Sequence, residues 1–221
     1  MSLTIVSLKS GTDVSRIGLS DGSLFSFKDC YLPGAYIADN YDIGSEINAD
    51  EEEAFRFASS CLRAEKRALQ LIARAEQTVF GLSLKLQKYG HETVCIRAVT
   101  AQLCDLNLLD DHRYARLWLE SRISRQATSP RRLLAALRSR GIDRHDAEAA
   151  LKETLDDEAE RQLLERYVQK LRRKRSGGKS ADSEGANSEG ADSEGANGAP
   201  LRYTLRSEGF SSLAIEIVLD Q

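Results

Sequence analysis

The sequence contains few of the residues that build disulfide frameworks or metal centres. Four cysteines, three prolines and one tryptophan occur in 221 residues. The cysteines form no C-x-x-C pair and no Cys/His cluster, so we expect buried, reduced thiols and no metal site. They are Cys30, Cys61, Cys95 and Cys104.

Long hydrophobic runs are absent as well. No stretch approaches the roughly 18 apolar residues that a membrane-spanning helix requires. The first twenty residues lack a basic start followed by an apolar run, which is the pattern of a secretory signal. We therefore expect a cytoplasmic protein that does not act at a membrane.

No catalytic or cofactor-binding pattern stands out. The stretch "SGGKS" at 176–180 ends like a phosphate-binding loop, but the first glycine of that motif is missing. Asp110, Asp111 and His112 stand side by side at the start of a helical pattern, where they more simply cap a helix. Nothing links the three histidines into one site. We expect a protein that is not an enzyme and that has no cofactor.

The charge is distributed unevenly, although the net charge is only −3. Residues 1–62 contain 4 Lys/Arg and 10 Asp/Glu, residues 63–175 contain 24 and 16, and residues 176–221 contain 3 and 8. The middle is therefore basic and both ends are acidic. A polyanion or an acidic protein surface would suit the middle as a partner, although a salt-bridged helical surface would also explain part of the excess.

Short β-type segments fill the start of the chain. Residues 3–8, 14–19 and 24–27 are rich in β-branched or aromatic residues and are separated by Gly, Ser and Asp. The "DG" dipeptide at 21–22 favours a two-residue type I′ hairpin turn. We expect a small β-rich module here.

Helical patterns dominate from Asp50 onward, where Asp50 has the spacing of an N-cap and Glu53 that of its capping-box partner. Gly90, Gly141 and Gly209 each follow two leucines, four and eight residues earlier, that share a helix face. Glycine is favoured just after a helix end, so each should end a helix. The leucine pairs are Leu82 and Leu86, Leu133 and Leu137, and Leu201 and Leu205.

A second helix is expected after each glycine, and a third before each leucine pair. After the glycines the apolar pairs are Ile96 and Val99, Ala147 and Ala150, and Ile215 and Val218. The preceding helix is clearest in "DDHRYARLWLESRIS", where Tyr114, Leu117, Trp118 and Ser121 are expected to share a face. At that spacing, core packing of Tyr114 and Trp118 is favoured over stacking on bases.

The unit is therefore three helices, repeated three times. We predict a mainly α fold of three tandem three-helix repeats that form an elongated curved body, preceded by a small β-rich N-terminal module. A five-residue period, SEGAN-SEGAD-SEGAN, interrupts the third repeat and predicts disorder. The predicted segments are the module 1–49, a helix and first repeat 50–109, a second repeat 110–155, and a third repeat 156–221 with the insertion at 176–199.

Basic residues are the candidate partner-binding residues. The apolar stripe of residues 130–140 turns the arginines of that helix outward, and similar positions in the other repeats are also basic. A solvated helix face is the simpler interpretation of any one of them. As a set they predict a stripe that binds phosphates or acidic groups. The set is Lys85, Lys88, Arg131, Arg132, Arg138, Arg140, Arg172, Arg173, Lys174 and Arg175.

The segments "LNLLDDHRYARLWLESRI" (106–123) and "SPRRLLAALRSRGID" (129–143), with the three three-helix units, resemble the RecX family of bacterial regulators of the RecA recombinase. The resemblance implies a protein that lies in the groove of the RecA–single-stranded DNA filament, contacts RecA and also the DNA, and acts as a monomer. It further implies modulation, most often inhibition, of ATP hydrolysis and strand exchange in recombination and repair. The alternatives are a stand-alone helical DNA-binding regulator and a protein–protein scaffold.

Overall fold

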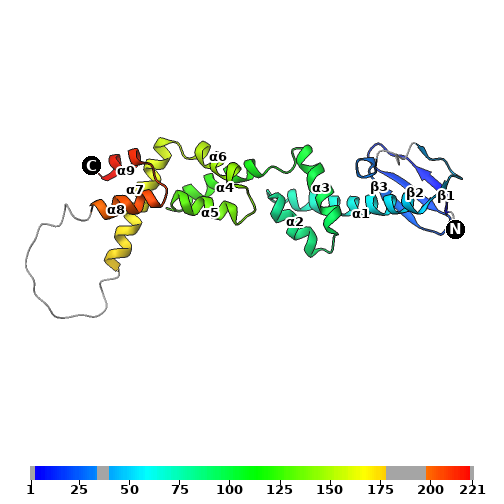
Figure 1. Ribbon diagram of the computed structural model, residues 1–221, viewed down its shortest axis with the longest axis horizontal. Helices are drawn as coiled ribbons and strands as arrows, with labels where there is room; N and C mark the ends of the chain where they lie inside the picture. The colour runs from blue at the N-terminus through cyan, green and yellow to red at the C-terminus, as the bar shows by residue number, and fades with distance from the viewer. Residues whose placement is uncertain (1–2, 34–39, 178–197, 220–221) are drawn as a thin grey trace, which may run out of the picture. The chain divides into compact units, whose positions relative to one another are not determined.

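A computed structural model describes residues 3–33, 40–177 and 198–219 (Figure 1). In the helix that ends at residue 177 the side chains are described as far as Arg173, and in the one that begins at residue 198 from Pro200 onward. Most of the tract that we predicted to be disordered lies outside the described residues. Its two ends are helical, so the prediction is wrong for residues 176–177 and 198–199.

The chain begins with a four-stranded antiparallel sheet in the order β3-β2-β1-β4. The β-rich module is therefore confirmed. Ile5 and Ile17 point into its core and are fully buried. The strands are β1 (Leu3–Lys9), β2 (Ser15–Leu19), β3 (Leu24–Phe27) and β4 (Glu46–Ile47), and a short 3-10 helix, η1 (Asp29–Tyr31), follows β3.

The hairpin between β2 and β3 is present, but its turn is not the type I′ turn that we expected. A type I′ turn needs a positive φ at both central residues, and Gly22 has one (87°) whereas Asp21 does not. The loop is longer: the Leu19 N–H donates to the Ser23 carbonyl at 2.8 Å. The Asp21 carboxylate accepts from the backbone N–H and the hydroxyl of Ser23, which holds this wider loop closed.

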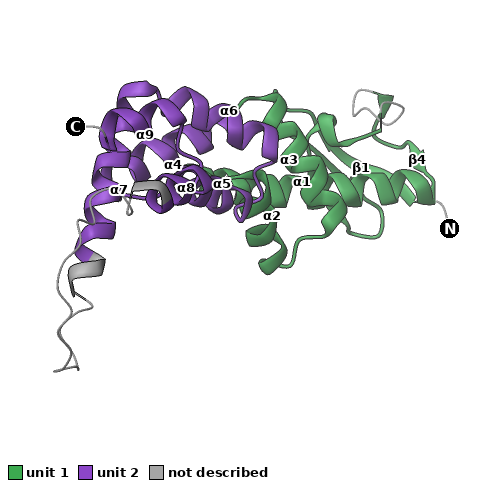
Figure 2. Cartoon of the chain, turned by 60° about the vertical axis from the view of Figure 1, so that its left-hand side comes forward, with its two compact units in different colours: residues 1–110 green, residues 111–221 purple. Residues whose placement is uncertain are grey.

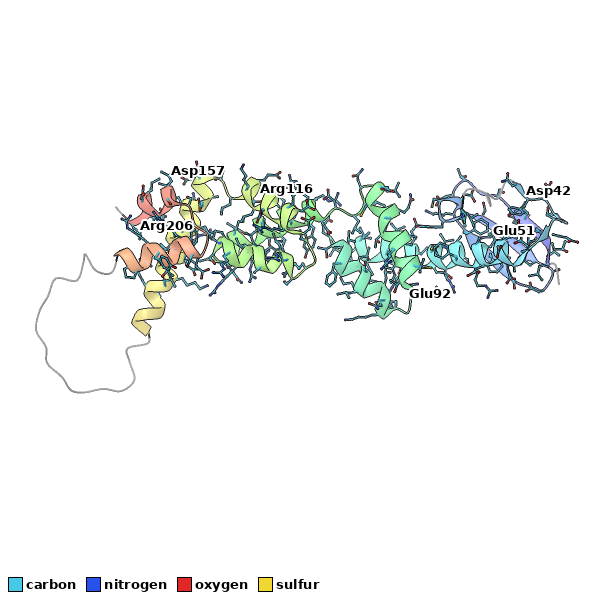
Figure 3. The ribbon with its side chains drawn as sticks, viewed as in Figure 1. Asp42, Glu51, Glu92, Arg116, Asp157 and Arg206 are labelled. Atoms are coloured by element: carbon cyan, nitrogen blue, oxygen red, sulfur yellow. The ribbon has the colours of Figure 1, made fainter. Side chains whose placement is uncertain are left out.

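Helix α1 (Ala49–Ile72) begins two residues earlier than the capping pattern predicted. Asn48 is the N-cap, and its side chain accepts from the Glu51 N–H at 2.9 Å. The Glu51 carboxylate (Figure 3 labels Glu51) in turn accepts from the Asn48 N–H at 2.7 Å, which completes a capping box. The reason is tertiary: Ile47 is still paired with Leu3 in the sheet, so the chain turns into the helix at the first residue after that pairing.

Eight further helices follow within the described residues, which confirms the mainly α fold. As predicted, Gly90, Gly141 and Gly209 have positive φ values (81°, 84° and 90°) just beyond the ends of α2, α5 and α8. The helices are α2 (Val79–Lys88), α3 (Thr93–Asp105), α4 (Asp111–Arg125), α5 (Pro130–Arg138), α6 (Arg144–Thr154), α7 (Asp157–Gly177), α8 (Gly198–Ser207) and α9 (Ser212–Leu219).

The chain divides into two compact units, residues 1–110 and 111–221, each with its own apolar core (Figure 2). In the first unit the Phe55 ring of α1 stacks on Phe27 of β3 at 5.3 Å between ring centroids, which joins the sheet to the helices. Leucine pairs of α2 and α5 are fully buried, as the spacing predicted. In the pair on α8, Leu205 is buried and Leu201 partly so.

The buried face of α4 differs from our prediction. Ala115, Leu119 and Ile123 point into the core, whereas Leu117 is 43% exposed. The buried stripe follows the i, i+4, i+8 row that packs against α6, and small alanines on α6 let the two helices approach closely. Trp118 lies beside this row, partly buried. The aromatic residues therefore mark the border of the buried face and not its centre.

The thiol prediction is correct for two cysteines and wrong for two. Cys61 and Cys95 are buried between α1 and α3, and burial raises the pKa of both thiols. Cys30 and Cys104 are exposed. None of the four forms a disulfide within the described residues.

Candidate partner-binding surface

Helix α5 presents the clearest cationic surface in the second unit. Leu133 and Leu137 are fully buried, which turns Arg132 and Arg138 to the exposed side. The helix contains no acidic residue. Within the described residues neither Arg132 nor Arg138 forms an ion pair, so both guanidinium groups can accept an external anion.

Arg131, which we had assigned to the same surface, has a structural role as well. Its backbone N–H donates to the Glu208 carbonyl at 3.0 Å, and its guanidinium donates to the Ser207 carbonyl at 3.4 Å. The Ser129 hydroxyl donates to the Glu208 carboxylate. These bonds join the start of α5 to the end of α8. The fit is close, because a Cβ on Gly209 would lie 3.4 Å from the Arg131 nitrogen.

Arg140 is held in place by Trp118. Its guanidinium lies 4.5 Å from the centroid of the indole ring and donates to the Ala136 carbonyl at 2.6 Å. Arg122 approaches the same ring at 5.8 Å. Cation–π stacking of this kind reduces the freedom of both side chains. Arg140 therefore contributes positive charge at a position that the fold determines.

The first unit contains an equivalent stack with the partners exchanged. Arg67 of α1 lies 3.9 Å from the centroid of the Tyr89 ring. Arg67 and Trp118 both stand 23 positions before their helix-ending glycine, and Tyr89 and Arg140 both stand one position before it. In one repeat the arginine is on the first helix, and in the other it follows the second helix. The spacing to the glycine could have revealed this pairing, although Arg67 was not among the predicted binding residues.

The two lysines of the predicted binding set that lie in the first unit are both exposed, but their surroundings differ. Lys85 is exposed, but its ammonium group donates to the Gln77 side-chain oxygen at 2.6 Å. Lys88 is exposed in the last turn of α2. Near them, burial and then the charges of Arg63 and Arg67 lower the pKa of His91. Arg63 and Arg67 therefore add positive charge close to the end of α2.

In α7, Arg172 and Arg173 are exposed. The side chains of Lys174 and Arg175 lie outside the described residues. Two basic residues outside the predicted set also bond to the second repeat. Arg166 donates to the Ser124 carbonyl in the last turn of α4 at 3.3 Å, and Lys170 donates to the Ala127 carbonyl of the α4–α5 connection at 3.0 Å. These two bonds join α7 to the second repeat.

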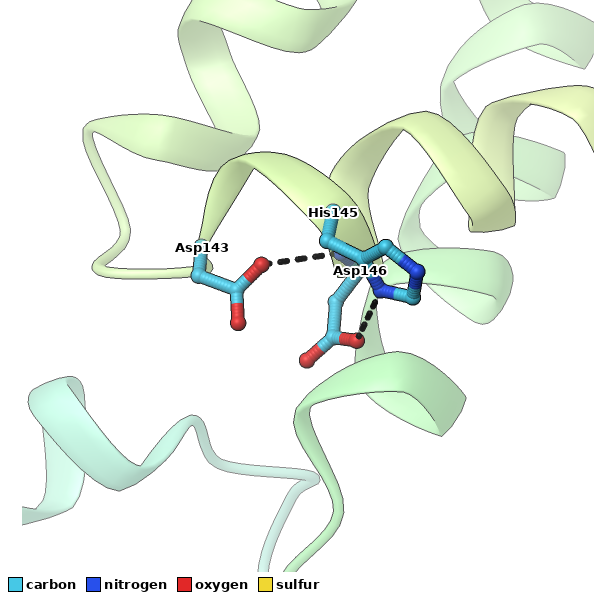
Figure 4. Close-up of side chains that lie close together, drawn as sticks. All are labelled: Asp143, His145 and Asp146. Carbon is cyan, nitrogen blue, oxygen red and sulfur yellow. Dashed lines mark hydrogen bonds and ion pairs between the residues drawn. The ribbon is translucent and has the colours of Figure 1, made fainter.

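One cluster of possible metal ligands occurs near the start of α6. The side-chain ligand atoms of Asp143, His145 and Asp146 lie within 4.8 Å of one another (Figure 4). Asp143 is the N-cap, whose carboxylate accepts from the Asp146 N–H at 2.9 Å, and His145 lies 3.5 Å from the Asp146 carboxylate. His145 is 92% exposed. Helix capping accounts for this arrangement.

The histidine that follows the two aspartates at the start of α4 also has a structural partner. The imidazole of His112 lies 3.4 Å from the Glu153 carboxylate on α6. It therefore faces the neighbouring helix of its own repeat.

Comparison with known proteins identifies the family of this chain. Residues 110–151 match the domain described as RecX, second three-helix domain. The regulatory protein RecX of Treponema pallidum (strain Nichols) is 36% identical over 135 residues, which cover 61% of this chain and 82% of that protein. The chain belongs to the RecX family.

A second RecX relative, from Mycolicibacterium smegmatis, is 33% identical over 117 residues, which cover 52% of this chain and 62% of that protein. Two solved RecX structures share the fold at 21% identity. One, described as regulatory protein RecX, has a TM-score of 0.68 and covers 99% of this chain and 100% of its own. The other, from Lactobacillus salivarius, has a TM-score of 0.57 and covers 74% and 96%.

None of the helices in the described part of this RecX-family chain is long and apolar enough to cross a membrane.

Proposed function

We propose that this RecX-family protein binds the RecA–single-stranded DNA filament and inhibits its ATP hydrolysis and strand exchange. The observation that supports it is the acid-free surface of α5, where Arg132 and Arg138 are exposed and unpaired among the described residues. A filament offers the same negatively charged surface at regular intervals. A chain of tandem helical repeats suits such a target because each repeat presents a similar face.

Rates measured with RecA on single-stranded DNA test the proposal. We expect the protein to slow ATP hydrolysis and strand exchange at ratios well below one molecule per RecA protomer, because one bound molecule blocks several protomers or an extending end. Binding to bare single strands, to duplex and to RecA-coated strands is measured in parallel. Equal affinity for bare and coated strands would instead support a stand-alone DNA-binding protein, and no affinity for any of them a scaffold.

The basic surface has its own test, in the double variant Arg132→Ala/Arg138→Ala. Loss of two exposed cations should weaken filament binding about tenfold at moderate salt and reduce its salt dependence, because each phosphate contact releases counterions. Helicity and melting temperature should not change, since both side chains are exposed. Arg131 and Arg140 are left intact because the fold uses them.

A matched control removes two other exposed arginines, in the variant Arg116→Ala/Arg144→Ala (Figure 3 labels Arg116). Each of these pairs with a glutamate of its own helix, Arg116 with Glu120 and Arg144 with Glu148. The change in net charge is the same, so a general charge effect would weaken both variants equally. Such a result would contradict a specific role for α5.

A further inference from the structure

The first unit contains a pocket that the basic surface does not use. It has a volume of about 620 Å³ and is lined by residues of η1 and the segment after it, of α1 and of α3. This size is within the usual range for ligand sites. The pocket exists because the sheet module packs on α1 beside α3, so neither the module nor the repeat forms it alone.

The floor of the pocket is apolar. Ala54 and Phe57 of α1 and Ala98 and Ala101 of α3 line it, and the small alanine side chains leave room between the two helices. Leu32 covers the side formed by the sheet module. An apolar floor of this kind favours burial of one or two hydrophobic side chains of a ligand.

The rim is acidic. Glu53 of α1 and Asp105, the last residue of α3, are both exposed at its edge. The C-terminal end of α3 adds the partial negative charge of the helix dipole beside Asp105. Among the described residues that line the pocket none is Lys or Arg. The whole segment 1–62 has a large excess of acidic residues, so its field has the same sign.

We propose that this pocket docks a short cationic segment of a partner protein, which places one or two apolar side chains on the alanine floor and lysine or arginine side chains against Glu53 and Asp105. Five of the eleven lining residues are exposed, so the site is open enough to admit a peptide from solvent. Charge complementarity selects the occupant: nucleic acid and acidic peptides are repelled by the rim. The N-terminal module thus gives the protein a second interaction surface, opposite in charge to α5.

Fluorescence anisotropy with the full-length protein tests this site. The probe is a fluorescein-labelled peptide of alternating leucine and lysine, and the control probe replaces each lysine by glutamate. We expect the cationic peptide to bind and the anionic one to bind at least tenfold more weakly. The variant Glu53→Gln/Asp105→Asn should lose about three- to tenfold in affinity, as expected for two exposed charge pairs.

Two further variants separate a specific pocket from general attraction to an acidic protein. Asp42→Asn/Glu46→Gln removes two exposed charges of the same module that do not line the pocket, and its affinity should change less than twofold. Ala101→Phe fills the pocket from an exposed position and should abolish binding while the circular dichroism spectrum is retained. Equal losses in the two charge variants, or unchanged binding by Ala101→Phe, would overturn the proposal.

The peptide assay contains neither RecA nor DNA, so its failure is distinct from failure of the proposed function. If the pocket proposal alone is wrong, the cationic peptide shows no pocket-dependent binding while filament inhibition persists.

Discussion

At the scale of single residues, one ion pair joins the sheet module to the helices. The Lys28 ammonium lies 2.9 Å from the Glu65 carboxylate and 3.0 Å from that of Asp13. Glu65 is 2% exposed, and within the described residues its second oxygen has no hydrogen-bond partner, nor does the nearby hydroxyl of Tyr31. Burial, followed by the charge of Glu65, raises the pKa of Tyr31. Lys28 is therefore the group that compensates the buried charge.

Lys28→Met should destabilise the protein by about 3 kcal/mol, because it leaves the Glu65 carboxylate buried without a counter-charge. Urea unfolding measures the loss. Lys66→Met, which removes an exposed lysine from the next position of α1, is the control and should change the stability by less than about 0.5 kcal/mol. The double variant Lys28→Met/Glu65→Leu should recover much of the loss; a double variant as unstable as Lys28→Met would contradict this role of Glu65.

The ion pair between Lys28 and Glu65 also predicts that the folding stability depends on pH. Burial lowers the pKa of Lys28, but the hydrogen bonds and charges of Glu65 and Asp13 outweigh it, and the pKa is raised above its ordinary value of 10.5. A raised lysine pKa contributes stability that is complete below about pH 10.5 and is lost as the pH rises through the folded-state value. The stability difference between the native protein and Lys28→Met should therefore stay constant up to about pH 10.5 and shrink between about pH 10.5 and pH 12. A constant difference in urea unfolding over that range would refute it.

At the scale of helices, the Arg67–Tyr89 stack and the Arg140–Trp118 stack have the same structural role. Each fixes the first helix of its repeat to the residue just before the helix-ending glycine. In these two repeats the two positions hold one cation and one ring, in opposite order. Because the pair acts across two helices, we expect the effects of changes at the two positions to be coupled.

Exchange of the partners in the first unit tests this equivalence. Arg67→Trp should cost about 0.5–1 kcal/mol through the lost stack, since Tyr89 is 54% exposed. Tyr89→Arg alone should cost a similar amount because it places two guanidinium groups together. The double variant Arg67→Trp/Tyr89→Arg reproduces the order of the second unit and should be more stable than either single variant. Thermal unfolding followed by circular dichroism gives the coupling energy between positions 67 and 89. Additive losses would show that the two positions are not coupled and would contradict the equivalence of the two orders.

At the scale of the whole molecule, the contacts of α7, α8 and α9 predict that the third repeat needs little from the connection between α7 and α8. Helix α9 packs on α7. The Glu160 carboxylate of α7 accepts from the N–H and the hydroxyl of Ser211, the residue just before α9, at 2.7 Å. Helix α8 is fixed to α5 through the bonds between Glu208 and residues 129–131.

Deletion of residues 181–195 should therefore change the melting temperature by only a few degrees, because loop closure costs little and a short connection of ordinary length remains. The readout is thermal unfolding, with filament binding as a second measurement. The deletion removes five acidic side chains, so binding at low salt should be equal or modestly tighter. A fall of many degrees would mean that the deleted residues pack against the repeats.

Several features followed from the sequence because they depend on local conformation. Glycine alone adopts the left-handed conformation at little cost, so Gly90, Gly141 and Gly209 marked helix ends without knowledge of their surroundings. Leucines four residues apart lie on one face of any helix, so Leu82 and Leu86 could be placed in the core. The outward direction of Arg132 and Arg138 followed from the same periodicity.

The tertiary structure decided whatever depends on a neighbour distant in the chain. Asn48 rather than Asp50 caps α1 because sheet pairing ends at Ile47, and the two capping patterns are equally good when taken alone. Arg131 and Arg140 resemble Arg132 in sequence, yet one bonds to the end of α8 and the other stacks on Trp118. A side chain's charge is a property of the sequence, but whether that charge is free to bind a partner depends on which backbone or ring the fold brings within reach.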